Sequence, residues 1–332
     1  HASLLTRHIG KPVMYVPDVV GDAARRAIEE LKPGDILLLD NVRFLEEETS
    51  SRSAEEQSKS LLVRSLTPLC DLFVFDAFSV AHRAHASVVG FIPVLPSVVG
   101  RVMEGEMAGA EKALNPERPN LFVLGGNKVE DCLEIMRFML EREAIDGVLT
   151  AGVLGELLLT SLGYELGGPT MTFLESKGFS DSLGEVDALL KGYGTIVKAP
   201  VDVAYEEGGR RREVGVEELP VENRILDIGG RTMRAYSAMI KAAETVVMKG
   251  PAGVYERPGF ETGTREIFKA IASSEGFTVL GGGDTVTALN STGIDRNRFS
   301  YVSLGGGALI TYLSGKKLPA VEALREKERA SI

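Results

Sequence analysis

Tryptophan is absent from the sequence, and cysteine occurs only twice, at Cys70 and Cys132. The two cysteines form neither a CxxC pair nor a regular framework, which counts against structural disulfides and favours a reducing compartment. We therefore expect a cytoplasmic protein. No apolar run approaches the ~20 residues that a membrane-spanning helix needs, so a membrane partner is not expected.

Basic residues are fewer than acidic residues. The chain has 37 Lys and Arg against 47 Asp and Glu, which gives a formal charge of −10 and a pI near 5.2. This balance argues against nucleic acid or an anionic membrane surface as a partner. Any anionic ligand must instead be held by a local group of basic side chains.

The length and the hydrophobic pattern predict two α/β domains. A chain of 332 residues exceeds what one core usually supports, and 44% hydrophobic content is enough for two cores. Short apolar runs alternate with amphipathic stretches, which is typical of a parallel sheet covered by helices. Ser53 and Glu56 form a capping box that predicts a helix start, and the stretch from Gly100 to Leu114 predicts a connecting helix. The strand candidates are Val13–Val16, Ile36–Leu39, Leu72–Phe75, Leu121–Leu124, Val148–Leu149, Ile196–Val197, Arg224–Leu226, Val246–Met248, Thr278–Leu280 and Tyr301–Ser303.

Glycine-rich turns follow four of the predicted strands. GGNKVED comes after Leu124, KGPAGVYE after Met248, GGGDTVTAL after Leu280, and LGGGALITYL after Ser303. Ligands of open parallel sheets bind beyond the carboxyl ends of the strands. Glycine permits close approach of the backbone, and helix starts offer amide hydrogens to phosphate. The turns together predict a polyphosphate site, although the sequence has neither a GxxxxGK[ST] nor an intact GxGxxG motif, which counts against a P-loop and against a dinucleotide dehydrogenase.

Three side chains in these turns have two possible roles each. Lys128 is either a solvated surface lysine or a phosphate ligand. Asp284 is either a helix N-cap or an oxygen ligand for Mg²⁺ on a nucleotide. Glu256 is either a surface acid or an acceptor for a ribose diol. The residues alone leave these alternatives open.

A second group of candidates lies in the first half of the chain. Arg43, His82 and Arg83 follow predicted strands and would meet at one edge of a parallel sheet, where an arginine fork binds phosphate or carboxylate. The alternatives are ion pairs of Arg43 with residues 46–48 and of Arg83 with Asp76. His85 is expected to be structural. Because further ligands for a metal and a nucleophile with its base are lacking nearby, we interpret the group as an anion site.

Eight segments, in order and spanning nearly the whole chain, resemble the phosphoglycerate kinase family. HRAHAS and GGGDT are the most specific parts of the resemblance. The segments are DNVRFLEEE, FVFDAFSVAHRAHASVVGF, FVLGGNKVEDCLEIM, APVDVAY, LDIGGRTM, GPAGVYE, VLGGGDTVTAL and SLGGGALITYLSGKKLPAVEAL.

The resemblance implies a hinge enzyme of two Rossmann-like, three-layer αβα domains with mostly parallel sheets, joined by a hinge helix. Residues 1–114 with the tail at about 315–332 would bind phosphoglycerate, and residues 115–314 would bind nucleotide. The implied reaction is reversible phosphoryl transfer between 1,3-bisphosphoglycerate and ADP, giving 3-phosphoglycerate and MgATP, by a monomer. Since the acceptor oxygen is already ionised, the reaction needs no general base, which agrees with the absence of a catalytic triad.

The resemblance also implies a role for each candidate residue. Arg43 and Arg83, with His82, would hold the phosphoglycerate, and Asp284 would contact Mg²⁺. Lys128 and the turn formed by Gly305, Gly306 and Gly307 would meet the transferred phosphate. The implied nucleotide-binding residues are Gly125, Gly126, Lys128, Glu256, Gly281, Gly282, Gly283, Asp284 and Thr285.

The sequence departs from the family pattern in three ways. Members usually carry an Asp-x-Asn contact, an arginine and a histidine-bearing loop upstream of the position of His1, so we expect an N-terminal segment to be missing here. Cys132 stands where many members have a second lysine, and Lys249 stands where asparagine is frequent. We hypothesise that Lys249 compensates for the lost cation. The alternative function is a nucleotide-binding relative with weakened catalysis and a binding or regulatory role.

Overall fold

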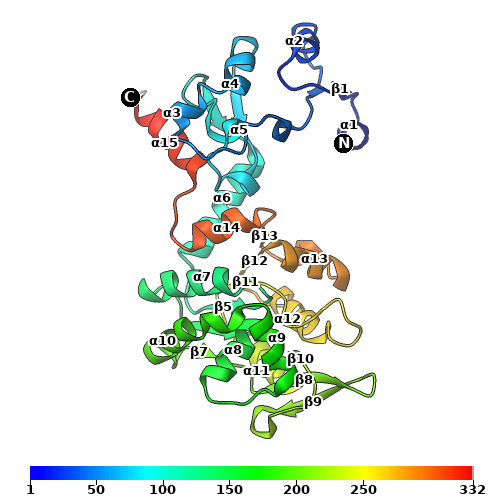
Figure 1. The fold of residues 1–332 in the computed structure, drawn as a ribbon, viewed down its shortest axis with the longest axis vertical. Helices are drawn as coiled ribbons and strands as arrows, with labels where there is room; N and C mark the ends of the chain where they lie inside the picture. Colours follow the sequence, from blue (N-terminus) through cyan, green and yellow to red (C-terminus); the bar gives the residue numbers. More distant parts are fainter. Residues whose placement is uncertain (331–332) are drawn as a thin grey trace. The chain divides into compact units, whose positions relative to one another are not determined.

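The chain folds into two compact units, drawn in Figure 1 from a computed structural model that describes residues 1–330. The first unit contains His1–Gly105 and the chain from Lys317 onward, and the second contains Glu106–Lys316. The division falls inside helix α6 (Arg101–Leu114), whereas the sequence placed the end of the first domain at Leu114. Among the described residues, none of the helices combines the length and apolar composition needed to cross a bilayer.

A six-stranded parallel sheet forms the centre of the second unit. Its strand order is β13-β12-β11-β5-β6-β7, and every neighbouring pair is parallel. All residues of β5, β6 and β11 are buried, which explains why these strands read as continuous apolar runs rather than alternating ones. The strands are β5 (Asn120–Leu124), β6 (Gly147–Thr150), β7 (Val197–Lys198), β11 (Thr245–Lys249), β12 (Phe277–Gly281) and β13 (Tyr301–Val302).

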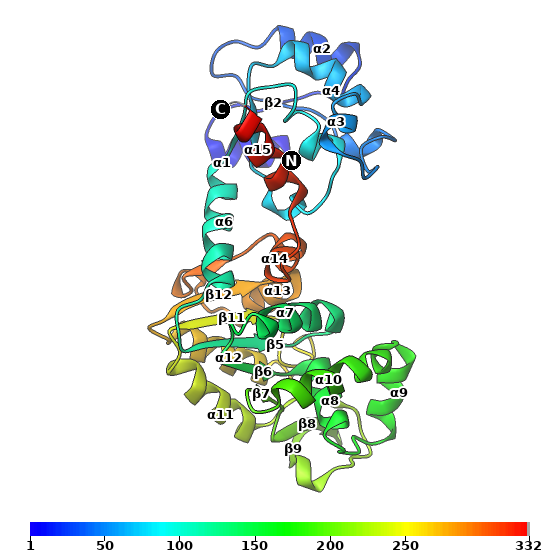
Figure 2. The same ribbon diagram turned by 90° about the vertical axis from the view of Figure 1, so that its left-hand side faces the viewer.

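Helices cover both faces of this sheet, as the α/β prediction requires (Figure 2). Side chains of α11 (Gly230–Lys241), α12 (Thr262–Ala272) and α13 (Gly283–Thr292) share one core with the strands. On the other side lie α7 (Val129–Glu141), α8 (Gly152–Ser161) and α10 (Leu183–Tyr193). Two further helices of this unit are α9 (Gly168–Ser176) and α14 (Gly306–Leu313).

A three-stranded antiparallel sheet extends the second unit. It contains β8 (Asp202–Glu207), β9 (Arg210–Gly215) and β10 (Ile225–Ile228), in the order β10-β8-β9. The expectation that the run at Arg224–Leu226 belongs to a parallel sheet is therefore wrong. Strand β10, which contains most of this run, pairs antiparallel with β8. The hairpin of β8 and β9 was not predicted, because it lacks the apolar run by which the other strands were recognised.

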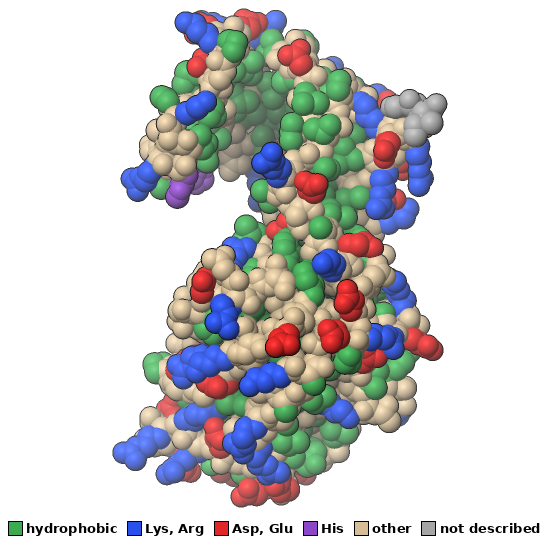
Figure 3. All heavy atoms as spheres, turned by 180° about the vertical axis from the view of Figure 1, so that it is seen from behind, with side chains coloured by type: hydrophobic (Ala, Val, Ile, Leu, Met, Phe, Trp, Pro, Cys, Tyr) green, Lys and Arg blue, Asp and Glu red, His purple; other side chains and the backbone are tan. Residues whose placement is uncertain are grey.

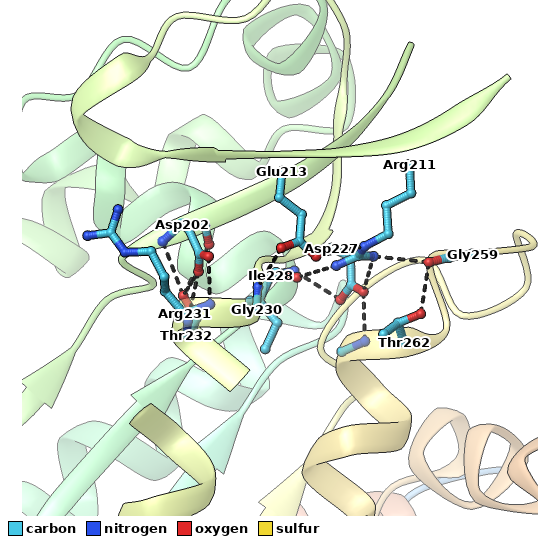
Figure 4. A network of polar contacts seen from close by, with 11 residues as sticks. Asp202, Arg211, Glu213, Asp227, Ile228, Gly230, Arg231, Thr232, Gly259 and Thr262 are labelled. Atoms are coloured by element: carbon cyan, nitrogen blue, oxygen red, sulfur yellow. Dashed lines mark hydrogen bonds and ion pairs between the residues drawn. The ribbon is translucent and has the colours of Figure 1, made fainter. Parts of the chain in front are cut away.

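Buried polar contacts tie this small sheet to the helices α11 and α12 (Figure 4). Asp202 accepts hydrogen bonds from the backbone N–H groups of Arg231 and Thr232, both at 2.7 Å. Asp227 accepts from Arg211 Nη1 and from Gly263 N, again both at 2.7 Å. Each carboxylate is thus satisfied by donors from other elements, as burial requires.

The first unit is built from two parallel strand pairs and short helices. β1 (Met14–Tyr15) pairs with β2 (Leu37–Leu38), and β3 (Phe73–Phe75) pairs with β4 (Ser97–Val99). Its core includes Leu62, Val63, Ala86 and Phe91. The helices are α1 (Ala2–Ile9), α2 (Asp22–Glu29), α3 (Ala54–Gln57), α4 (Leu61–Leu66), α5 (Ala86–Val89) and α15 (Pro319–Ala330).

The sequence predicted only part of the secondary structure of this unit. The capping box is confirmed at the start of α3, because Ser53 Oγ accepts from Glu56 N and Glu56 Oε2 accepts from Ser53 N. The short strand β4 was not predicted, since three residues between proline and glycine give little pattern. The final helix belongs to this unit, where Ala320 N donates to Ala81 O at 3.2 Å.

Candidate functional site

Glycine turns from adjacent strands come together at one edge of the six-stranded sheet. Strands β5, β11 and β12 are neighbours and run parallel, so their carboxyl ends lie side by side. Gly125 N donates to Lys249 O, and Gly126 N donates to Pro251 O, each at 2.8 Å. Gly250 has φ +83°, and a Cβ there would lie 2.0 Å from Gly125 O. Only glycine fits at this approach of two turns.

A cavity of about 390 Å³ opens at these turns. Its size falls in the range of small-molecule sites. Of the residues proposed from the sequence, Gly126, Glu256 and Asp284 line it. The other lining residues are Asn127, Gly152, Val153, Glu156, Phe173, Arg224, Leu226, Pro251, Gly253, Val254 and Tyr255.

The turn between β12 and α13 positions Asp284 at the cavity. The residue at the N-cap of α13 is Gly282, with φ +99°, and Asp284 lies in the first helical turn, where its side chain is exposed. Thr285 is fully buried; its hydroxyl donates to Gly281 O and accepts from Gly250 N, both at 2.7 Å. Thr285 therefore holds two glycine turns together, while the exposed side chain of Asp284 lines the cavity.

Two lysines approach the first glycine turn differently. Lys128 precedes α7 and is exposed. Lys249 is only 6% exposed; its Nζ donates to Lys128 O at 3.1 Å and to Cys132 Sγ at 3.3 Å, and lies 3.3 Å from Asp131 Oδ2. The ammonium group of Lys249 thus lies beside the side chain of residue 132, for which the resemblance implied a second lysine. Burial raises the pKa of the Cys132 thiol, with Lys249 opposing it.

The last glycine turn adjoins the previous one but does not line the cavity. Gly305 is the N-cap of α14, which begins at Gly306 and continues through Gly307. A Cβ on Gly306 would lie 3.3 Å from Gly283 N, so the starts of α13 and α14 are close together. Leu304 N donates to Glu106 Oε1 at 2.9 Å, which holds the turn on α6.

The structure adds polar side chains that the sequence reasoning missed. Glu156 is 6% exposed, and burial raises its pKa to about 8, although the charge of Arg224 opposes the shift. The guanidinium of Arg224 stacks on Phe173, 3.4 Å from the ring centroid. A signal for Glu156 was present, because it is the one charged residue in the apolar stretch GVLGELLLT.

The basic group of the first unit has internal contacts of its own. Arg83 Nε donates to His82 Nε2 at 3.3 Å, and burial lowers the pKa of His82, assisted by Arg83 and His85. His85 faces the buried carboxylate of Glu48, with Nδ1 4.0 Å from Oε1. This contact fits a structural role for His85.

The described part of the chain contains neither of the alternative ion pairs, that of Arg43 with residues 46–48 or that of Arg83 with Asp76. Asp76 accepts from Met103 N at 2.8 Å, and no ion pair links it to Arg83 within residues 1–330. Arg43 lies in a short 3₁₀ helix (Val42–Phe44), is exposed, and makes no ion pair with a described residue. Neither guanidinium group forms an ion pair with a residue in the described part of the chain.

An open parallel sheet with glycine turns at a cavity is typical of α/β proteins that bind phosphorylated ligands. The sequence profile of the phosphoglycerate kinase family matches residues 1–316. The chain belongs to this family, and it is a phosphotransferase with a carboxyl group as acceptor.

Individual relatives agree with this assignment. The chain is 43% identical to the phosphoglycerate kinase of Methanopyrus kandleri, over 98% of this chain and 80% of that protein. It is also 43% identical to the phosphoglycerate kinase of Methanothermobacter thermautotrophicus, over 98% of this chain and 79% of that protein. The crystal structure of phosphoglycerate kinase from Pyrococcus horikoshii OT3 matches with a TM-score of 0.93 and 36% identity, covering 99% of this chain and 82% of that one. The predicted α/β fold class is confirmed.

Proposed function

We propose that the protein catalyses reversible, Mg²⁺-dependent phosphoryl transfer between 1,3-bisphosphoglycerate and ADP, which gives 3-phosphoglycerate and ATP. The observation that carries this proposal is the cavity at the glycine turns, because Gly126, Glu256 and Asp284 line it together in a member of this family. A cytoplasmic monomer is part of the same proposal.

The nucleotide would lie along the carboxyl ends of β12, β11 and β5. Glu256 would accept hydrogen bonds from the ribose, and Gly125 with Gly126 would let the backbone approach the phosphates. Asp284 suits a nucleotide-bound Mg²⁺, because this ion is usually held by one or two carboxylates together with phosphate oxygens. The described residues hold no cluster of three or more metal-ligating side chains, which agrees with a metal that arrives with the nucleotide. Bound there, Mg²⁺ would neutralise charge on the phosphates.

The phosphoglycerate would be held by Arg43 and Arg83 in the first unit. Both guanidinium groups can bind a phosphate or carboxylate through two parallel hydrogen bonds. His82 would be neutral, because burial and Arg83 lower its pKa, and its role would be to orient Arg83 through their hydrogen bond.

The chemistry would rest on alignment and charge neutralisation rather than on proton transfer. The acceptor is a carboxylate or a phosphate oxygen that is already ionised, so the protein needs to orient it and to balance the charge of the moving phosphoryl group. Lys128 and the amide hydrogens at Gly305–Gly307 would supply that balance, and Gly281–Gly283 would keep the backbone close to the phosphates.

A coupled assay of ATP formation from 1,3-bisphosphoglycerate and MgADP tests the proposal. We expect turnover that depends on Mg²⁺ and falls at least about a hundredfold in Asp284→Asn, since a metal contact is lost. Asp187→Asn, an exposed acid on α10, is the matched control. Tight MgADP binding without turnover would instead favour the relative with weakened catalysis.

A further inference from the structure

The loop between β11 and α12, residues 250–261, carries Glu256, the side chain proposed for the ribose. The side chain of Glu256 is exposed, so its position is set mainly by the backbone of the loop. Hydrogen bonds within the loop, such as that from Arg257 N to Val254 O at 3.0 Å, give it a local shape but do not fix it to the rest of the unit. The position of Glu256 therefore depends on contacts at either side of it.

Arg211 on β9 reaches this loop from the small antiparallel sheet (Figure 4). Its Nη1 donates to Gly259 O at 3.0 Å and to Asp227 Oδ2 at 2.7 Å. Its Nη2 donates to Ile228 O at 2.7 Å, and its Nε donates to Glu213 Oε1 at 3.0 Å. Only 15% of the Arg211 side chain is exposed. One guanidinium group thus joins β9, β10 and the end of the loop.

Asp227 contacts the chain at both ends of the same loop. Its carboxylate is 3% exposed and accepts from Gly263 N at 2.7 Å, in the first turn of α12. Gly253 lies against it, because a Cβ there would be 2.4 Å from Asp227 Oδ1. The pair of Arg211 and Asp227 therefore touches the chain on both sides of Glu256.

A second ion pair also joins the loop to the small sheet, between Arg257 and Glu206 on β8. Its two side chains are 47% and 32% exposed, and ion pairs in contact with water stabilise little because water screens them. The Arg211 contact is the more enclosed of the two. It also includes the face of Phe260, which is 1% exposed and whose ring centre lies 5.6 Å from the guanidinium carbon, within the range of a cation–π contact.

We propose that Arg211 is a positioning residue for ribose recognition, because it fixes the loop so that the carboxylate of Glu256 faces the ribose hydroxyls. The proposal rests on the proposed function, since it assumes that the cavity holds a nucleotide. Arg211 is not among the described residues that line the cavity, so it acts through the loop and not on the ligand. A carboxylate accepts from two neighbouring hydroxyls only when it is held in place, because hydrogen bonds weaken steeply with misalignment.

Calorimetric titration of the full chain with MgADP and with the magnesium complex of 2′,3′-dideoxyADP tests the proposal. The dideoxy nucleotide lacks both ribose hydroxyls, so the ratio of the two affinities measures ribose recognition alone. We expect the unsubstituted chain to bind MgADP on the order of tenfold more tightly, and Glu256→Ala to bring the ratio near one. Arg211→Met keeps the apolar packing and loses the donors. It should lower the ratio by at least about threefold, through weaker binding of MgADP alone.

Arg211→Met by itself leaves the buried Asp227 without its cation, which destabilises the folded chain. The double variant Arg211→Met with Asp227→Asn removes both charges of the pair, and it should show the same loss of ribose preference. Arg211→Met added to Glu256→Ala should not change the ratio further, because both substitutions act on one contact with the ligand. Arg212→Ala is the matched control, since Arg212 is the next residue on β9 and forms an exposed ion pair with Glu207.

Each outcome bears on a separate claim. An unchanged ratio in the folded double variant would overturn the positioning role while leaving the proposed function intact. So would equal losses of both affinities, or a fall of the ratio in Arg212→Ala as large as that in Arg211→Met. Equal affinity of the unsubstituted chain for the two nucleotides would overturn the role as well, since Glu256 would then not bind the ribose. Failure of MgADP to bind the unsubstituted chain would overturn the proposed function and this inference together. Circular dichroism of each variant separates loss of binding from loss of fold.

Discussion

At the residue scale, the buried Glu156 makes the stability of the chain depend on pH. Burial raises its pKa in the folded chain to about 8 from an ordinary value of 4.5. Arg224 is the charged group that bears on it, and Arg257 in turn affects Arg224. A folded state that binds this proton more tightly than the unfolded state gains stability below pH 4.5 and loses it as the pH rises through about 8.

We therefore predict that Glu156→Gln flattens the pH dependence of the free energy of unfolding. The unsubstituted chain should lose a few kcal/mol, by order of magnitude, between about pH 4.5 and about pH 8, because each pKa unit corresponds to about 1.4 kcal/mol. The glutamine variant lacks this loss. Urea unfolding across that range measures it. Burial also raises the pKa of Asp227, to about 6, but this residue contributes equally to the pH dependence of both chains. Identical slopes of unfolding free energy against pH in the two chains would therefore contradict the prediction.

The contribution of Lys249 to catalysis can be tested by substitution. Its ammonium group lies beside Cys132, with Nζ 3.3 Å from the sulfur. We predict that Lys249→Ala lowers kcat/KM for MgADP by about tenfold or more, because a cation near the phosphates is lost. The double variant Lys249→Asn with Cys132→Lys moves the charge to the usual position and should restore most of the activity.

Lys316→Ala is the control for the lysine experiment, since Lys316 forms a surface ion pair with Glu134. Unchanged nucleotide affinity and turnover in Lys249→Ala would remove the compensation hypothesis. Failure of the double variant to recover, with its fold intact by circular dichroism, would show that position 132 does not face the phosphates.

At the element scale, the strands predicted from the sequence include both exposed ones, such as β1, and the buried strands of the six-stranded sheet. β5, β11 and β12 are continuous apolar runs because helices cover both sides of them. β9 escaped prediction for the opposite reason. β9 has an edge position and contains Arg210, Arg211 and Arg212, so its pattern resembles a polar loop. Its pairing depends on the hairpin and on the Arg211–Asp227 contact, which are tertiary features.

The start of α11 gives a test at this scale. Asp202 accepts from Arg231 N and Thr232 N, and it also contacts Thr232 Oγ1 at 2.5 Å. We predict that Asp202→Ala destabilises the chain by about 1–3 kcal/mol, because buried amide hydrogens at a helix start lose their acceptor. The midpoint of urea unfolding measures this, with exposed Asp187→Ala as the control. A midpoint equal to that of the control would show that Asp202 adds nothing to stability.

At the scale of the whole molecule, the sequence predicted which glycine turns meet at one edge of the sheet better than which side chains surround them. The glycine turns were recognisable because each follows a strand, and parallel topology brings Gly126 and Asp284 to one edge. Glu156, Phe173 and Arg224 could not be assigned in advance, because their meeting depends on how α8, α9 and β10 pack. The overall balance of charge is equally uninformative about the site, since Lys and Arg side chains lie among Asp and Glu side chains on the face drawn in Figure 3.

The proposed assignment of one ligand to each unit leads to a final prediction. Arg83→Ala should weaken binding of 3-phosphoglycerate by at least about tenfold, through loss of a bidentate contact, and leave the affinity for MgADP unchanged. Asp284→Asn should do the reverse, because Asp284 lies in the cavity of the second unit. Turnover should fall in both variants, since the reaction needs both ligands in place.

Separate calorimetric titrations with each ligand measure the two affinities, and Arg25→Ala provides the control, because Arg25 forms an exposed ion pair with Glu29 in the first unit. A loss of MgADP binding in a folded Arg83→Ala variant would contradict the division of ligands between the units. So would unchanged 3-phosphoglycerate binding in that variant, because Arg83 would then have no part in holding the acceptor.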